Sequence, residues 1–208
     1  NLIYSFTRGL FFVLFKLFYR LSISGKENIP ESGAVIIVSN HTSYLDPIVL
    51  AVAVSSRPIN FMAKEELFSI PVLNILVRKL RAFPVRRGKP DKSAFETALQ
   101  VLLKSEILGL FPEGTRRRLG RLQLGPGERG AAVIALKSKA PIIPVAIIGT
   151  DKVMMEEKKL PRFPKIRVII GKSFIISDEG DKKERINKAV NKIMQAILTL
   201  LRENIDES

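Results

Sequence analysis

Cysteine is absent from this chain of 208 residues, and histidine occurs only once. Without cysteine the chain has no disulfide framework, no thiolate zinc site and no cysteine nucleophile, and its composition fits an intracellular location. One histidine also argues against a zinc or di-iron centre, although magnesium held by carboxylates stays open. The single imidazole is therefore the first candidate for acid–base chemistry.

Acidic residues are few beside the basic ones, with 20 Asp and Glu against 34 Lys and Arg and a net charge of +14. Such a charge attracts nucleic acid, anionic lipid or phosphorylated substrates, and by itself it does not choose among them. Seven of the fifteen Phe and Tyr residues fall in the first twenty positions, away from most of the charge. Nucleic-acid sites place aromatic side chains inside a basic groove, so we expect no nucleic-acid partner. Only strongly salt-dependent binding to DNA or RNA would revive that alternative.

A long uninterrupted apolar run is missing as well. Residues 1–21 are mostly apolar or aromatic, but Arg8 and Lys16 limit the charge-free stretch to residues 9–15. A bilayer-spanning helix needs about 20 mostly apolar residues, so the segment favours a helix that lies in the membrane interface. Its polar stripe consists of Asn1, Ser5, Arg8, Lys16 and Arg20. A core helix is the alternative, whereas a signal peptide is disfavoured because no small-residue cleavage site follows Leu21.

Short apolar runs alternate with amphipathic stretches along the rest of the chain. Strands are expected at 34–39, 59–63, 82–85, 107–111, 141–148 and 166–170, and helices at 47–55, 91–104, 128–138, 181–204 and in a segment ending near 79. This alternation predicts an α/β fold with a largely parallel mixed sheet flanked by helices, plus the N-terminal amphipathic helix. The last helix has an apolar face that we interpret as core packing, formed by Ile186, Val190, Ile193, Ile197 and Leu201.

The length and a hydrophobic content of 46% suit a single domain with a substantial core. We predict a division into residues 1–24, a helical segment at the membrane interface, and residues 25–208, the α/β domain.

The single histidine lies in a stretch that follows the first expected strand, residues 40–46. Asp46 and Pro47 then form a good helix start, because Asp can cap and Pro suits the first helical position. His41 is therefore expected in a loop between a core strand and a helix, where α/β proteins often carry catalytic groups.

The spacing of His41 and Asp46 decides what they can do together. On a regular helix five residues advance about 500°, which leaves the two side chains on different faces. They meet only if the segment between them is a turn, which the hydroxyls of Thr42 and Ser43 favour. If they meet, the carboxylate holds one imidazole nitrogen and leaves the other as a base. Alternatively, Asp46 merely caps the helix and His41 is an ordinary loop residue.

A second motif begins where the strand at 107–111 ends. Within residues 111–118 a turn glycine, a hydroxyl and three consecutive arginines follow the strand. Gly114 allows positive φ or close approach to a ligand, and arginine suits phosphate because its fork donates hydrogen bonds in pairs. The alternative is an exposed loop with solvated charges.

In order and separation these motifs resemble the glycerolipid acyltransferase family, specifically the 1-acylglycerol-3-phosphate (lysophosphatidic acid) acyltransferases. That family is marked by Asn-His-x4-Asp, a basic block, Phe-Pro-Glu-Gly-Thr-Arg and an Ile-Pro-Val strand. Here they are residues 40–46, 64–87, 111–116 and 143–145. His-x4-Asp alone is a weak signal, but with Phe-Pro-Glu-Gly-Thr-Arg about seventy residues later the joint pattern is specific.

The resemblance implies acyl transfer from acyl-CoA or acyl carrier protein to the sn-2 hydroxyl of lysophosphatidic acid, which yields phosphatidic acid for phospholipid biosynthesis. It implies no metal and no cofactor, since the thioester donor is a co-substrate. His41 would take the proton from the attacking hydroxyl, and Asp46 would fix the imidazole tautomer. Because the implied transfer is direct, Ser43 as a nucleophile is the weaker alternative.

The resemblance also implies an acceptor site. Its residues are Lys64, Arg87, Glu113, Gly114, Thr115 and Arg116. The two arginines would hold the phosphate, with Lys64 assisting, and Glu113 and Gly114 would shape the site. Backbone donors near Gly114 and Thr115 would add to it or face the developing oxyanion.

Two residues depart from the family's pattern and bear on headgroup selection. Arg117 stands where many members carry a small polar residue, and Arg86 where many carry an acidic one.

Such an enzyme would lie at the cytoplasmic face of the cell membrane, interfacial rather than spanning, with the lipid acceptor and the anionic bilayer as partners. One alternative is an acyltransferase for glycerol-3-phosphate or another lysophospholipid. Another is a non-enzymatic protein that binds anionic lipid, which would leave the His41–Asp46 spacing and residues 111–116 without a reason.

Overall fold

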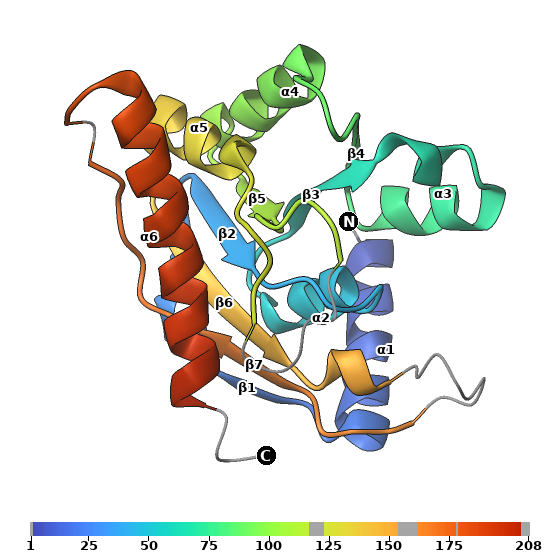
Figure 1. Ribbon diagram of the computed structural model, residues 1–208. Helices are drawn as coiled ribbons and strands as arrows, with labels where there is room; N and C mark the ends of the chain where they lie inside the picture. The colour runs from blue at the N-terminus through green and yellow to red at the C-terminus, as the bar shows by residue number, and fades with distance from the viewer. Residues whose placement is uncertain (1, 117–122, 154–161, 178, 205–208) are drawn as a thin grey trace.

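A seven-stranded sheet forms the centre of the protein (Figure 1). The computed structural model describes residues 2–116, 123–153, 162–177 and 179–204. The strands are β1 (Ser22–Ser24), β2 (Val35–Ser39), β3 (Ile59–Lys64), β4 (Phe83–Val85), β5 (Ile107–Leu110), β6 (Ile142–Ile148) and β7 (Arg167–Ile170). The helices are α1 (Leu2–Tyr19), α2 (Asp46–Ala53), α3 (Pro71–Lys79), α4 (Lys92–Leu103), α5 (Arg129–Ser138) and α6 (Lys182–Glu203), with 3-10 turns η1 (Lys26–Asn28), η2 (Glu65–Phe68) and η3 (Thr150–Lys152).

The strand order is β1-β7-β6-β2-β5-β3-β4, and every neighbouring pair is parallel except β6 and β7. The predicted α/β fold with a largely parallel mixed sheet is thus confirmed. Because β2 through β6 run in the same direction, their carboxyl ends meet at one edge of the sheet, where open α/β sheets bind ligands.

Helices cover both faces of the sheet. Successive side chains of a strand point to opposite faces, so Val35 and Ile37 of β2 enter one core cluster and Ile36 and Val38 enter the other, all four fully buried. The first cluster packs under α1, α2 and α3, and the second under α4, α5 and α6 (Figure 1). A strand buried on both faces reads as a continuous apolar run, which is how residues 34–39 appear in the sequence.

The observed elements follow the expected ones, with β1 as an addition. Its three residues pair in parallel with β7 at the sheet's edge. Such a short strand carries no usable periodicity, so the sequence did not indicate it. The apolar face of α6 packs on the core as interpreted, with Ile193, Ile197 and Leu201 buried.

One side of α1 belongs to the core and the other is exposed. Phe15 is 3% exposed and packs with the core, together with the partly buried Phe11 and Tyr19. Leu10, Val13, Leu14, Leu17 and Phe18 lie on the exposed side. Among the described residues no helix is both long and apolar enough to cross a bilayer. The division after residue 24 stays a prediction, and residues before it contribute to the core and the sheet.

Candidate active site

The predicted site residues come from several strands that end at the same edge of the sheet. The loop after β2 carries His41, the segment after β5 carries residues 111–116, and η3 follows β6. Lys64 is the last residue of β3, and Arg87 lies just beyond β4. The edge therefore brings together side chains that are far apart in the sequence.

His41 and Asp46 meet across a turn. Asp46 Oδ2 lies 2.9 Å from His41 Nδ1 and also accepts hydrogen bonds from the backbone N–H groups of Thr42 and Ser43, each at 2.7 Å. Asp46 is fully buried and His41 is 7% exposed. The alternative in which Asp46 merely caps the helix is wrong, because Leu45 is the N-cap of α2 with no side-chain cap, whereas the Asp46 carboxylate holds the imidazole and closes the turn. With Nδ1 engaged, Nε2 is the nitrogen available as a base.

The ring of His41 is also held from its face and from its backbone. Phe111 stacks on it with centroids 4.1 Å apart and an interplanar angle of 20°, and Phe61 stacks behind Phe111 at 6.2 Å. The preceding residue, Asn40, donates to the carbonyl of Ile147 and accepts from its N–H, both at 2.8 Å. This amide extends the ladder between β2 and β6 and fixes where the loop begins.

Glu113 lies inside the protein, 2% exposed, and links two loops. Its Oε1 accepts from the backbone N–H of His41 at 3.0 Å, and its Oε2 accepts from that of Gly125 at 2.8 Å. The next residue, Gly114, has φ +66°, and a Cβ there would lie 2.8 Å from Glu128 Cγ. Any other residue would therefore be strained and crowded at this position.

Lys64, Arg87 and Arg116 form a group that we call the cationic cluster. All three side chains are exposed. Desolvation and then the positive charge of Arg116 lower the pKa of Arg87, whereas Glu66 raises it. Lys64 forms an ion pair of 3.0 Å with Glu66. Guanidinium groups that repel each other at a surface form a site that an anion stabilises.

Tyr44 and Thr150 complete the surroundings of the dyad. The guanidinium carbon of Arg116 lies 3.1 Å from the centroid of the Tyr44 ring, a cation–π contact with a ring that is 66% exposed. The hydroxyl of the buried Thr150 lies 3.2 Å from that of Thr42. Tyr44 thus connects the His41 loop to the cationic cluster, and Thr150 connects it to β6.

The structure brings some predicted residues together and separates others. His41 meets Asp46, and Arg87 and Arg116 are electrostatic neighbours, whereas the carboxylate of Glu113 points into the backbone beneath the site. Thr115 is exposed and directly precedes Arg116 of the cationic cluster in the sequence. The roles of all these residues in binding or catalysis stay predictions.

The two departures from the family's pattern have different outcomes. Arg86 lies 3.5 Å from the Asp91 carboxylate, which also accepts a hydrogen bond from the Arg86 backbone. Arg117 lies outside the described residues.

Sequence reasoning singled out neither Tyr44 nor Thr150. Tyr44 stands between His41 and Asp46, and its position inside the motif was the one available signal. Thr150 follows an apolar strand without any motif of its own.

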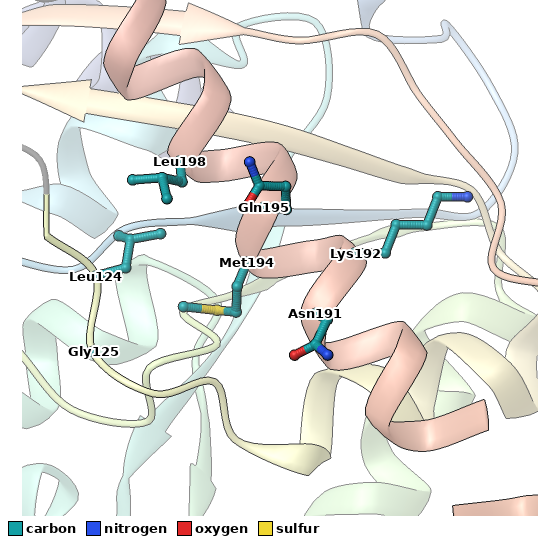
Figure 2. Close-up of a pocket in the computed structure, with 7 residues that line it drawn as sticks. All are labelled: Leu124, Gly125, Asn191, Lys192, Met194, Gln195 and Leu198. Atoms are coloured by element: carbon teal, nitrogen blue, oxygen red, sulfur yellow. The ribbon is translucent and has the colours of Figure 1, made fainter. Parts of the chain in front are cut away.

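A shallow pocket of about 550 Å³ lies between residues 124–125 and α6. Leu124, Met194 and Leu198 form its apolar part, and Asn191, Lys192 and Gln195 add polar groups (Figure 2). Gly125 lines the pocket and donates its N–H to Glu113. Gly125 therefore belongs both to the pocket and to the pair of hydrogen bonds by which Glu113 connects it to His41.

Comparison with known proteins gives a consistent result. The family described as Acyltransferase matches residues 20–148. The chain is 32% identical to a 1-acyl-sn-glycerol-3-phosphate acyltransferase of Bacillus subtilis (strain 168), over 95% of this chain and 96% of that protein. It is 31% identical to the chloroplastic enzyme BAT2 of Brassica napus over 86% of this chain, and spans 52% of that longer protein.

Among solved structures, the 1-acyl-sn-glycerophosphate (LPA) acyltransferase PlsC from Thermotoga maritima has a similar fold, with a TM-score of 0.66. The match covers 93% of this chain and 81% of the other, at 23% identity.

Proposed function

The chain belongs to the acyltransferase family, and we propose that it transfers an acyl chain from acyl-CoA or acyl carrier protein to the sn-2 hydroxyl of lysophosphatidic acid, forming phosphatidic acid. The observation that carries this proposal is the buried contact of 2.9 Å between His41 and Asp46 beside an exposed cationic cluster. A base next to cations suits an acceptor that carries a hydroxyl and a phosphate. The names of the relatives from Bacillus subtilis and Brassica napus support this choice of acceptor.

His41 acts as the general base. As the acceptor oxygen attacks the thioester carbonyl carbon, its proton passes to Nε2 of His41. The tetrahedral intermediate then expels the thiolate, which takes that proton, so the C–S bond is replaced by a C–O bond. Asp46 accepts from Nδ1–H throughout and stabilises the imidazolium. No covalent intermediate with Ser43, and no metal or cofactor, is needed, because the thioester is already activated.

Glu113 acts as a positioning residue. Its carboxylate receives the N–H of His41 and the N–H of Gly125, so it holds the catalytic loop from beneath. Because it is 2% exposed and both oxygens are engaged, we assign it no direct contact with the acceptor.

The cationic cluster holds the phosphate of the acceptor. Arg87 and Arg116 supply paired donors, and Lys64 assists once it leaves Glu66. The N–H of Gly114 already donates to the carbonyl of Phe111 at 3.0 Å. Of the two predicted backbone donors, we therefore assign that of Thr115 to the phosphate or to the oxyanion.

Helix α1 holds the enzyme in the interface of the bilayer, at the cytoplasmic face of the membrane. Its exposed side carries Leu10, Val13, Leu17 and Phe18, while Phe15 packs inward. The net charge of +14 adds attraction to anionic lipid. This arrangement brings a soluble donor and a lipid acceptor to the same site.

The test is phosphatidic acid formation from lysophosphatidic acid with acyl-CoA and with acyl carrier protein as donors, for the wild type and His41→Ala. We expect activity that falls by at least about 10³-fold in a variant that still unfolds cooperatively, with a lowered melting temperature because a buried ring is lost. Activity retained by the variant would contradict the role of His41. If the wild type acylates glycerol-3-phosphate but not lysophosphatidic acid, the acceptor is glycerol-3-phosphate. If it acylates no acceptor, the chain is better explained as a lipid-binding protein.

A further inference from the structure

Helix α3 and the residue before it, Ile70, carry an exposed apolar patch that neither the fold nor the proposed chemistry uses. Ile70 is 47% exposed, Val72 is 77% exposed and Ile75 is 60% exposed. On the inner side of the same helix Val77 is 8% exposed, and Leu76 and Leu80 pack against the core. Single exposed apolar residues are ordinary on a protein surface, but three within six positions form a patch that marks an interaction site.

Basic residues border this patch. Arg78 and Lys79 are exposed in the last turn of α3. At its other end lie Glu65 and Glu66, and Glu66 is paired with Lys64. A backbone hydrogen bond, then the Lys64 ammonium, and to a lesser degree Arg87 hold the pKa of Glu66 below its usual range. The pattern of an apolar surface with adjoining cations is typical of segments that lie on anionic bilayers.

The position of α3 in the chain ties the patch to the candidate active site. The helix connects β3, which ends at Lys64, to β4, which is followed by Arg87. Two of the three residues of the cationic cluster are therefore attached to the two ends of this connection. Helix α3 also covers the same face of the sheet as α1, since Leu76 and Phe11 pack against the same core cluster (Figure 1).

We propose that Ile70, Val72 and Ile75 insert into the surface of an anionic bilayer, as a second contact beside α1. The contact presses the cationic cluster against the lipid headgroups from which the acceptor is drawn. This inference rests on the proposed function for its purpose, but the contact itself depends only on the patch and its charges. A bilayer suits the patch better than a second copy of this chain, because two chains of net charge +14 repel each other, whereas an anionic lipid surface attracts each of them.

The absence of tryptophan from the sequence allows a direct test. Ile75→Trp places a single reporter in the patch, and Leu103→Trp places one on α4, where Leu103 is 75% exposed over the opposite face of the sheet. The wavelength of tryptophan fluorescence emission is recorded without and with vesicles of equal parts phosphatidylglycerol and phosphatidylcholine. We expect a blue shift for Ile75→Trp and none for Leu103→Trp. A protein that binds the vesicles without a shift at Ile75→Trp overturns the proposal.

A second measurement uses the double variant Val72→Ser with Ile75→Ser, and Leu103→Ser as its matched control. We expect partition onto the same vesicles to fall about tenfold in the double variant and to stay unchanged in the control. Unchanged partition in the double variant contradicts the proposal, and conversion of a dimer to a monomer by light scattering would assign the patch to a second copy.

Activity separates this inference from the proposed function. On a short-chain, water-soluble lysophosphatidic acid the double variant should equal the wild type, whereas on vesicles it should be slower. A blue shift in a protein that acylates no acceptor would keep the bilayer contact and reject the proposed function. Acyl transfer on vesicles at equal rates by the wild type and the double variant would keep the proposed function and reject the bilayer contact.

Discussion

The His41 loop and the cationic cluster lie at the same edge of the sheet, but they are built in opposite ways. In the loop Asp46 is fully buried, and its Oδ2 takes part in three hydrogen bonds. In the cluster the cations are exposed, Lys64 forms an ion pair with Glu66, and Arg116 lies over the face of an exposed ring. One region is fixed by the protein itself, and the other is open to an incoming group.

This difference is what the roles we propose for the two regions require. A general base must have its tautomer and orientation set before the substrate arrives, and buried hydrogen bonds set them without reorganisation. A phosphate site must exchange its contacts with the ligand, and an exposed ion pair is worth only about 0–1 kcal/mol. Opening the ion pair of Lys64 and Glu66 therefore costs little free energy, whereas breaking the buried contacts of Asp46 costs more.

Asp46→Asn should break the fixed region and have the largest effect among these changes. The amide oxygen can take the place of Oδ2 and keep these three contacts, but the NH2 group then occupies the buried position of Oδ1, for which the described structure shows no hydrogen-bond partner, and the imidazolium loses its negative neighbour. We expect kcat to fall by about 10³-fold with little change in the KM for lysophosphatidic acid, as measured by steady-state kinetics. Asn60→Ala, which removes a buried hydrogen bond to the carbonyl of Ile107, is the stability control and should keep kcat. A rise in KM alone would place Asp46 in binding.

Arg116→Gln should break the open region instead. Loss of a charged hydrogen bond to phosphate is worth about 1.5–3 kcal/mol, so we expect the KM for the phosphorylated acceptor to rise about 10- to 100-fold. The melting temperature should not change, because Arg116 is exposed and its contact with the Tyr44 ring is at the surface. Arg202→Gln, an exposed arginine on α6, is the control for lost charge. Equal KM values in the wild type and Arg116→Gln would remove Arg116 from the acceptor site.

The two regions were not equally predictable from the sequence. His41 and Asp46 are five residues apart, so turn residues between them were enough to indicate their contact. The contact of Glu113 with the N–H of His41 joins residues 72 apart and depends on the pairing of Val38 with Leu110. Strand register is set by the packed sheet rather than by local preference, so only the structure shows that Glu113 turns inward.

The same limit applies to the fold. The strands that are buried on both faces were indicated by their apolar runs, and α6 by its apolar face. Other features depend on contacts between residues far apart in the sequence: the strand β1, the antiparallel pairing of β6 with β7, and the core packing of Phe15. A short edge strand and a helix with apolar residues on both sides carry no local signal for these choices.

Glu113→Gln should sharpen the comparison, because Glu113 and Arg116 belong to the same short segment but to different regions. The side-chain amide would face one backbone N–H, of His41 or of Gly125, and leave it without an acceptor. We expect a stability loss of about 2 kcal/mol, which lowers the melting temperature by roughly 4–8 °C, and a kcat that falls about tenfold. Calorimetry and kinetics together check this. A raised KM with unchanged melting temperature would return Glu113 to the acceptor site.

Tyr44→Leu should give the smallest effect, because Tyr44 lies where the two regions touch. The ring supports the Arg116 guanidinium through a cation–π contact at an exposed position, which is worth about 0.5–1 kcal/mol. Losing it should raise the KM for lysophosphatidic acid about two- to fivefold and leave kcat unchanged, since the contacts of Asp46 do not involve the ring. Tyr44→Phe keeps the aromatic face and should behave as the wild type. If Tyr44→Phe and Tyr44→Leu lose activity equally, the phenolic hydroxyl rather than the ring face matters. If Tyr44→Leu lowers kcat, the ring belongs to the fixed region.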